Sequence, residues 1–182
     1  MDFIAREAKE SFAAVLQGLN IDRFALFGHS VGGGMAVNCA ASYPGACIAL
    51  VTESAQAFLE DRTIAGLQAA RELFKDPEQI ERLKKYHGDK AEWVLNAWIE
   101  TWLAPAFATW SLAPILPQVH CPVLAIHGAD DEYGTSKHPE LIEQLAGGPA
   151  QVEIMADTRH VPHREREDAV VARVAAFLRP LD

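Results

Sequence analysis

The segment over residues 23–45 constrains the fold more than any other part of the chain, because it predicts a strand, a tight turn and a helix in immediate succession. Residues 23–28 form a short apolar run, and residues 31–40 have helical character up to a stop at Pro44-Gly45. The turn between them holds a serine with one glycine two positions before it and another two positions after it. Units of this kind build parallel sheets, so the segment favours an α/β fold.

The other expected strands follow the same alternation with helices. Residues 47–51 and 123–126 are continuous apolar runs, which are typical of parallel strands covered on both faces. Residues 151–155 alternate polar and apolar side chains, which predicts a last strand nearer to an edge of the sheet. We therefore expect an α/β fold with a mostly parallel sheet and helices on both faces.

Helices are expected at both ends of the chain. The first twenty residues predict one amphipathic helix that ends near Gly18 and Asn20. The closing helix ends at Pro180, and its apolar residues are expected to form one stripe. That stripe consists of Val170, Val171, Val174, Phe177 and Leu178.

A long helical insertion separates two parts of the expected sheet. We divide the chain into residues 1–54, which carry the turn and its strands, a helical lid over residues 55–120, and residues 121–182, which complete the sheet. All four tryptophans fall in the lid, and Trp98 and Trp102 lie one helical turn apart. Two interpretations stay open: the tryptophans form the lid's own core, or Trp98 and Trp102 line an acyl pocket.

Composition and charge exclude several classes of protein. The 182 residues suit a single domain with a substantial core, and the formal net charge of -9 would repel polyanions, so no nucleic acid partner is expected. The three cysteines are widely spaced and indicate neither a disulfide framework nor a zinc site. The chain has no secretory signal pattern and no apolar run of membrane-spanning length. We expect a cytoplasmic protein with no membrane partner.

The turn over residues 28–32 has the form G-x-S-x-G, in the strand-to-helix context that gives this motif its meaning. Such a serine adopts a strained backbone conformation, and Gly28 and Gly32 are expected to let strand and helix approach each other. Ser30 would then project its hydroxyl above the sheet, while the backbone N–H of Val31 donates to a developing oxyanion. The alternative is a glycine-rich turn that serves packing only.

The run Gly28-His29-Ser30-Val31-Gly32-Gly33 is similar to the nucleophile elbow of the α/β-hydrolase fold family. In that family a catalytic acid follows a later strand in the pattern glycine, two residues, aspartate, and residues 126–131 resemble it. This resemblance implies Asp131 as the acid. Asp130, one position earlier, stays open as the orienting carboxylate, although a solvated loop position suits it better.

The family's histidine follows the last strand, and residues 158–163 resemble that histidine loop. The resemblance implies His160 as the catalytic histidine. The residue before this histidine is commonly glycine in the family, whereas here it is Arg159. His163 stays open as an alternative, its plainer interpretation being a residue hydrogen-bonded near the loop. A zinc site formed by His160, His163 and a carboxylate is conceivable, but H-x-x-H in a loop lacks the usual ligand arrangement. No metal and no cofactor are expected.

These residues imply a serine hydrolase, with a carboxylic ester hydrolase as the leading interpretation and a small acyl compound as the substrate. Ser30 would attack a carbonyl, His160 would accept its proton and return it to the leaving group, and Asp131 would fix the tautomer of the histidine. The order serine, aspartate, histidine along the chain is the one expected for this fold. The relatives also cleave lactones, thioesters and carbon–carbon bonds, and fold alone does not choose among them.

The resemblance begins in the helix before the elbow, so the chain corresponds to the C-terminal part of an α/β-hydrolase fold. The family's earlier strands, and the loop that supplies a second oxyanion N–H, have no counterpart in it. Losing one such donor typically costs about 10²–10³ in rate, so the chain alone is expected to be impaired. The strand at residues 23–28 would expose an edge open to pairing, so the chain is expected to aggregate, to dimerise through that edge, or to be a fragment or mis-started reading frame of a longer protein. The alternative function is a non-catalytic binding module.

Overall fold

The computed structural model describes residues 3–181, which form two compact units. One unit consists of residues 3–58 and 111–181, and the other of residues 59–110. We refer to them as the sheet unit and the helical unit. The helical unit lies within the insertion expected from the sequence, and its role as a lid stays a prediction.

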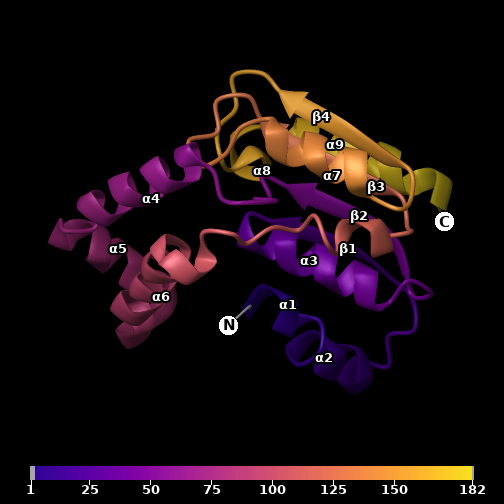
Figure 1. The fold of residues 1–182 in the computed structure, drawn as a ribbon, viewed down its shortest axis with the longest axis horizontal. Helices are drawn as coiled ribbons and strands as arrows, with labels where there is room; N and C mark the ends of the chain where they lie inside the picture. The colour runs from indigo at the N-terminus through magenta and orange to yellow at the C-terminus, as the bar shows by residue number, and fades with distance from the viewer. Residues whose placement is uncertain (1–2, 182) are drawn as a thin grey trace. The chain divides into compact units, whose positions relative to one another are not determined.

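The sheet unit is built on four parallel strands in the order β1-β2-β3-β4 (Figure 1). They are β1 (Phe24–His29), β2 (Cys47–Glu53), β3 (Val123–Gly128) and β4 (Ala150–Met155). β2 and β3 are almost completely buried at the centre, whereas β1 and β4 form the edges. The structure confirms the predicted α/β fold with a parallel sheet, and the alternating strand lies at an edge as expected.

Helices cover both faces of this sheet, as predicted. On one face α3 (Val31–Ser42) packs on β1 and β2, and α7 (Lys137–Leu145) packs on β3 and β4. On the other face α9 (Glu167–Leu178) buries Val170 and Phe177 (Figure 1). These two side chains pack against alternate residues of the central strands, namely Ala49, Val51, Leu124 and Ile126. The short helix α8 (Pro162–Glu165) and the 3-10 turns η3 (Leu116–Gln118) and η4 (Arg179–Leu181) complete the unit.

Residues 3–20 do not form the single helix that the spacing of the first twenty residues predicts, and residues 1 and 2 lie outside the described part of the chain. Two helices, α1 (Phe3–Glu7) and α2 (Ser11–Leu19), are separated by a turn in which the carbonyl of Arg6 accepts from two backbone N–H groups. The Tyr43 hydroxyl donates to the carbonyl of Ala8 at 3.1 Å, so a tertiary contact takes a group that a continuous helix would use. α1 buries Ile4 and packs on α3, whereas Val15 and Leu19 of α2 stay exposed. The segment is helical as predicted, but it forms two helices instead of one.

The stripe expected on the closing helix is also narrower than predicted. Val170 and Phe177 are buried, and Val174 and Leu178 pack against the same cluster. Val171 is exposed instead. Consecutive residues of a helix do not face the same way, so Val170 and Val171 cannot both lie on the buried side.

The helical unit contains α4 (Asp61–Leu73), α5 (Pro77–His87) and α6 (Ala91–Leu103), with 3-10 turns η1 (Gly88–Lys90) and η2 (Pro105–Phe107). α5 begins at Pro77, and Asp76 caps it by accepting from the N–H of Glu78 at 2.9 Å. The unit has its own core at Ala70, Leu95 and Ile99. Trp98 packs against this core, so the interpretation of the tryptophans as internal packing holds for it.

A second aromatic group lies further along the helical unit. The ring of Trp102 is 5.0 Å from that of Phe107 and 5.4 Å from that of Trp110, centroid to centroid. Trp102 is only 3% exposed, whereas Trp93 is 69% exposed.

Over residues 3–181, no helix combines the length and the apolar character needed to cross a bilayer.

Candidate active site

Ser30 occupies the sharp turn between β1 and α3. Its φ and ψ of 54° and -124° lie in a region that side chains rarely adopt, as expected for a strained elbow. Two backbone hydrogen bonds hold this conformation, one from the Ser30 N–H to the carbonyl of Glu53 and one from the Gly33 N–H to the carbonyl of Ser30, both at 2.9 Å. The hydroxyl is thereby presented at the carboxyl end of the sheet.

The glycines that packing requires around Ser30 are Gly28 and Gly33, not Gly28 and Gly32 as predicted. A Cβ at Gly28 would lie 2.4 Å from the carbonyl oxygen of Gly32, so a side chain there would push strand and helix apart. A Cβ at Gly32 would meet nothing within 4 Å. The expectation that Gly32 must be small for packing is therefore wrong within this unit, and Gly33 fills that part, since its Cβ would lie 2.4 Å from that of Ala55.

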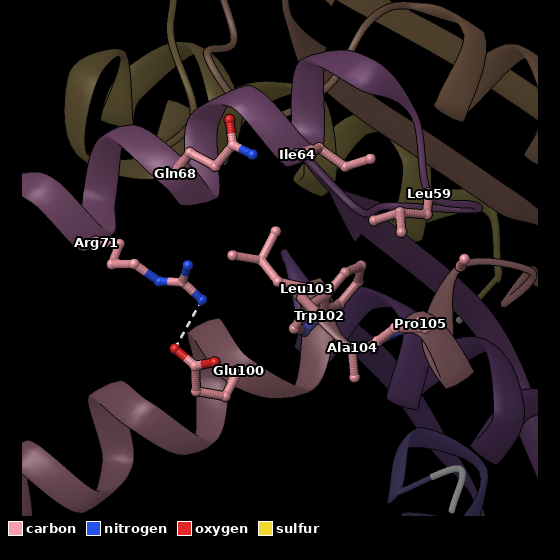
Figure 2. Close-up of a pocket in the computed structure, with 10 residues that line it drawn as sticks. Leu59, Ile64, Gln68, Arg71, Glu100, Trp102, Leu103, Ala104 and Pro105 are labelled. Carbon is pink, nitrogen blue, oxygen red and sulfur yellow. Dashed lines mark hydrogen bonds and ion pairs between the residues drawn. The ribbon is translucent and has the colours of Figure 1, made fainter.

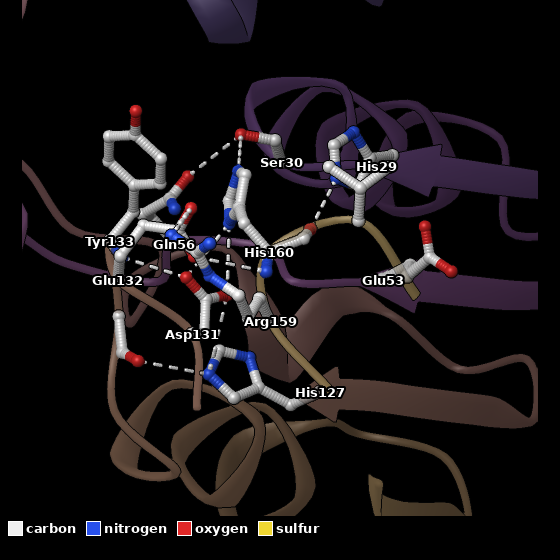
Figure 3. A network of polar contacts seen from close by, with 12 residues as sticks. His29, Ser30, Glu53, Gln56, His127, Asp131, Glu132, Tyr133, Arg159 and His160 are labelled. Carbon is white, nitrogen blue, oxygen red and sulfur yellow. Dashed lines mark hydrogen bonds and ion pairs between the residues drawn. The ribbon is translucent and has the colours of Figure 1, made fainter. Parts of the chain in front are cut away.

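Three loops bring a hydroxyl, an imidazole and a carboxylate into one line (Figure 3). The Nε2 atom of His160 lies 3.0 Å from the Oγ atom of Ser30. Its Nδ1 atom lies 2.9 Å from both carboxylate oxygens of Asp131. Because a carboxylate only accepts, Nδ1 carries the proton and Nε2 presents its lone pair to the serine hydroxyl.

Asp131 is fully buried, yet its environment favours the charged form. Burial by itself would raise its pKa, but the hydrogen bond from His160, the charge of that ring and the N–H of Tyr133 outweigh it, so the pKa of Asp131 lies below its usual value. His127 lies on the other side of the carboxylate, with Nε2 3.7 Å from Oδ2. Asp131 is therefore held as an ionised hydrogen-bond acceptor.

The two alternatives weighed for these roles lie elsewhere. The side chain of Asp130 is exposed, and its backbone N–H donates to the carbonyl of Thr158 at 2.9 Å. The Nδ1 atom of His163 lies 2.5 Å from Oε2 of Glu53, away from the Ser30 hydroxyl. Neither residue joins the line through Ser30, and the zinc set of His160, His163 and a carboxylate is not brought together as proposed.

The histidine loop is held at its backbone by acidic side chains. Glu165 accepts from the N–H groups of Arg159 and Val161, at 2.8 and 3.0 Å. Glu132 accepts from the N–H of His160 at 3.2 Å and pairs with the exposed guanidinium of Arg159 at 3.1 Å. Arg159, which departs from the family's usual glycine, is accommodated in this way.

Two further contacts tie the histidine loop to the strand ends. A Cβ at Gly128 would lie 2.1 Å from the carbonyl oxygen of Arg159, so only glycine lets β3 approach the loop this closely. The Nε2 atom of His29 lies 2.8 Å from the carbonyl oxygen of His160 and donates to it. Burial lowers the pKa of His29, which favours the neutral ring in this position.

The comparisons with known proteins agree with this geometry. The profile described as the alpha/beta hydrolase family matches residues 2–173. The chain belongs to the alpha/beta hydrolase family. Membership accounts for the nucleophile elbow and for the succession of the three loops, and it confirms the resemblance expected from the sequence.

Curated relatives of this hydrolase-family chain are distant and longer than it is. The chain is 25% identical to mouse (Mus musculus) serine hydrolase BPHL over 186 residues, which cover 97% of the chain and 62% of the relative. It is 25% identical to the human (Homo sapiens) protein of that name over 171 residues, which cover 89% of the chain and 56% of the relative. The chain thus spans less than two thirds of the length of the curated relatives it matches.

Solved structures show the same fold. A bacterial membrane phospholipase A superposes with a TM-score of 0.79 at 23% identity, covering 98% of this chain and 63% of that one. At such low sequence identity the superposition shows a shared fold only, and the chemistry must be argued from the site.

Sequence reasoning missed several residues of this hydrolase-like site. Gln56, almost fully buried, lies 3.4 Å from Oγ of Ser30 through its side-chain oxygen. The ring of Tyr133 stands edge-on to that of His160 at 4.7 Å between centroids. Glu53 was the one with a sequence signal, since it is a carboxylate at the carboxyl end of an expected strand, two positions after the apolar run, where α/β folds place their sites.

The helical unit carries a pocket of about 560 Å³ (Figure 2). Apolar side chains, among them Leu59, Ile64 and Trp102, line one part of it, and the ion pair between Arg71 and Glu100 lines another. Trp102 borders this pocket, whereas Trp98 does not line it. The interpretation that Trp98 and Trp102 line an acyl pocket stays a prediction.

Proposed function

We propose that this member of the alpha/beta hydrolase family is a serine hydrolase that cleaves carboxylic esters through an acyl-enzyme on Ser30. The observation that carries the proposal is the line of hydrogen bonds from Ser30 through His160 to Asp131. A serine hydroxyl is a poor nucleophile unless an aligned base accepts its proton, and this line provides one.

In the first half of the reaction, Ser30 Oγ attacks the ester carbonyl while His160 Nε2 accepts the hydroxyl proton. His160 becomes an imidazolium, and the ionised Asp131 stabilises it through the bond to Nδ1. His160 then donates the proton to the departing alkoxide, which leaves as an alcohol. Burial alone would raise the pKa of Asp131, but its hydrogen bond with His160 helps to lower it, so the carboxylate stays charged throughout.

In the second half, water attacks the acyl carbonyl and His160 acts again as base and then as acid, which releases the carboxylic acid and restores Ser30. The tetrahedral intermediate of each half carries an oxyanion. α3 begins at Val31, so the N–H of Val31 is among the first four that have no partner inside the helix. This N–H is our candidate donor to the oxyanion.

The substrate is proposed as a small or medium acyl ester. The names of similar structures include a phospholipase and a meta-cleavage product hydrolase from Pseudomonas fluorescens, so these names do not agree on one substrate. We propose ester cleavage, and compounds with lactone, thioester and cleavable carbon–carbon bonds are to be tested beside esters.

A binding module with impaired catalysis is the second candidate function. Two observations favour it: the chain spans 62% and 56% of the length of its curated relatives, and Val31 is the single oxyanion donor assigned. A site in which a single oxyanion donor acts is slower by about 10²–10³, so an aligned triad would then give weak turnover.

A fluorophosphonate probe with peptide mapping by mass spectrometry tests the proposal, and a panel of acyl esters, lactones and thioesters then identifies the bond. We expect an adduct on Ser30 that is lost in Ser30→Ala and formed far more slowly in His160→Ala. Trp93→Ala, an exposed position of the helical unit, is the matched control and is expected to react at the wild-type rate. A folded wild-type chain that forms no adduct would favour the binding module.

A further inference from the structure

Three potential metal ligands lie beside the catalytic line without belonging to it. His29 and Glu53 are register partners at the carboxyl ends of β1 and β2, so their side chains leave the same face of the sheet (Figure 3). His163, on α8, brings its ring to this pair. One ring nitrogen of each histidine and one carboxylate oxygen of Glu53 all lie within 4.8 Å of one another.

Two imidazoles and one carboxylate form a donor set that suits divalent transition metals, zinc above all. Bonds of about 2.0–2.2 Å to such an ion place the ligand atoms roughly 3.3 Å apart in a tetrahedral site. Small rotations of the two rings and the carboxylate close the remaining difference. A fourth position would be left for water, because the cluster supplies three ligands.

Glu53 gives an independent reason to expect a ligand in this position. Its side chain is fully buried, and Oε1 has no hydrogen-bond partner among the described residues. Oε2 has one partner, Nδ1 of His163 at 2.5 Å. A buried carboxylate oxygen without a partner costs about 1–3 kcal/mol or more, and an ion in the site would offset that cost.

His29 is set up as a ligand by its other contact. Its Nε2 donates to the carbonyl of His160, so the neutral ring carries its lone pair on Nδ1. A ring that donates one N–H to a backbone carbonyl while its second nitrogen binds metal is the usual arrangement around zinc. His163, 37% exposed, leaves a path from solvent to the cluster.

We propose that His29, Glu53 and His163 bind a divalent transition-metal ion of the zinc class, and that the bound ion slows the reaction at Ser30. Binding replaces the hydrogen bond between Nδ1 of His163 and Glu53: the ring passes its proton from Nδ1 to Nε2 by way of solvent, and the metal takes a lone pair from each ligand. No atom of the protein or of the ion changes its oxidation state.

The slowing follows from the position of the cluster. The His29 ring is 5.0 Å from the His160 ring, centroid to centroid. His160 must become an imidazolium when Ser30 attacks, and a second positive charge nearby opposes that step. This part of the proposal rests on the proposed hydrolase function, whereas the binding of the ion does not.

The test uses zinc chloride with the whole chain in two measurements, calorimetric titration and the rate at which a fluorophosphonate modifies Ser30. Wild type is expected to bind one zinc ion and to react several-fold more slowly when zinc is bound. Glu53→Gln and His163→Gln should each weaken binding at least about tenfold and abolish the slowing. His87→Gln, which removes an exposed histidine of α5, is the matched control and should bind zinc as wild type does.

Far-UV circular dichroism shows whether each variant folds. If Glu53→Gln does not fold, the test rests on His163→Gln, because His163 is partly exposed. Wild type that binds no zinc at about 0.1 mM, or variants that all bind it equally, would overturn the site. Zinc bound through these residues with an unchanged rate at Ser30 would overturn its inhibitory role. A chain that binds zinc but never reacts with the probe separates the two ideas, because the metal site then stands and the hydrolase fails.

Discussion

Two acidic residues of the sheet unit are buried, whereas the ion pair beside the pocket of the helical unit is exposed. In the sheet unit Asp131 and Glu53 are fully buried, and each pairs with a histidine from a distant loop. In the helical unit the ion pair between Arg71 and Glu100 has side chains 42% and 63% exposed. A buried charge that loses its partner is costly, whereas an exposed pair contributes little. Precise chemistry should therefore depend on the sheet unit, and the helical unit should tolerate change.

The sharpest contrast between the units is expected at Ser30. Ser30→Ala removes the nucleophile and should lower ester turnover by about 10⁴-fold or more, to whatever rate oxyanion stabilisation and binding alone support. Steady-state hydrolysis of an activated ester measures this. Trp93→Ala, in the helical unit, should stay within about twofold of wild type. Comparable losses in the two variants would remove the distinction between the units.

The next largest effect is expected at Asp131. Asp131→Asn keeps the shape of the side chain but favours the wrong tautomer of His160, so turnover should fall by about 10⁴-fold at most, and less than in Ser30→Ala. The substitution also tests stability. Because the pKa of Asp131 is lowered in the folded chain, its carboxylate stabilises the fold above the ordinary pKa, and this contribution is lost as the pH falls through the lowered value.

Denaturant unfolding across acid pH measures that contribution. The difference in unfolding free energy between wild type and Asp131→Asn should be largest near neutral pH and shrink in acid. A difference that is constant with pH, or that grows as the pH falls, would contradict the account of Asp131.

The packing of the elbow predicts a smaller, structural effect. Gly28→Ala places a Cβ against the carbonyl of Gly32 and should destabilise the sheet unit by about 1–3 kcal/mol. Gly32→Ala meets open space within α3 and gains helix propensity, so it should be neutral or stabilising by up to about 1 kcal/mol. Equal losses of unfolding free energy in these two variants would show that the close contact at Gly28 is not what demands glycine.

The free edge of the sheet predicts self-association. Within residues 3–181, β1 has a neighbouring strand on one side only, and its Phe27 is 48% exposed. Phe27→Lys adds a charge to this edge and should weaken any self-association by about tenfold, as measured by analytical ultracentrifugation. Tyr86→Lys, at an exposed aromatic of the helical unit, is the control and should change it little. A chain that stays monomeric at high concentration would overturn this proposal.

The smallest effect is expected in the helical unit. A double-mutant cycle with Arg71→Ala and Glu100→Ala should give a coupling free energy below about 1 kcal/mol, because both side chains are largely solvated. Chemical denaturation monitored by tryptophan fluorescence suits the unit that holds all four tryptophans. A coupling of several kcal/mol would place a second energetically tight network outside the sheet unit.

Local sequence patterns were sufficient for much of the fold. Apolar runs predicted the first three strands, since a buried parallel strand needs apolar side chains on both faces, and the alternation of polar and apolar residues predicted β4. The elbow could be recognised because its glycines, its serine and the flanking elements lie within a few consecutive residues. The predicted single helix at the N-terminus failed for the opposite reason, because the break near Ala8 depends on Tyr43, which lies 35 positions away.

Tertiary pairing explains what was missed at the site. Glu53 and His163 are 110 residues apart, and nothing in their separate surroundings indicates that they meet. Gln56 approaches Ser30 only because β2 ends beside the elbow. Gly33 rather than Gly32 is restricted, because the contact comes from Ala55 on another segment. A motif specifies its own neighbours in the chain, whereas these contacts depend on the assembled sheet.

The rate at which a fluorophosphonate modifies Ser30, compared between wild type, His160→Ala and Asp131→Asn, tests the central claim most directly. If Ser30, His160 and Asp131 act as one unit, the rate falls in both variants and falls most in His160→Ala, while the folded structure is kept. If Ser30 reacts equally fast in all three folded proteins, the hydrogen-bonded line plays no part in activating the serine, and the hydrolase account is contradicted.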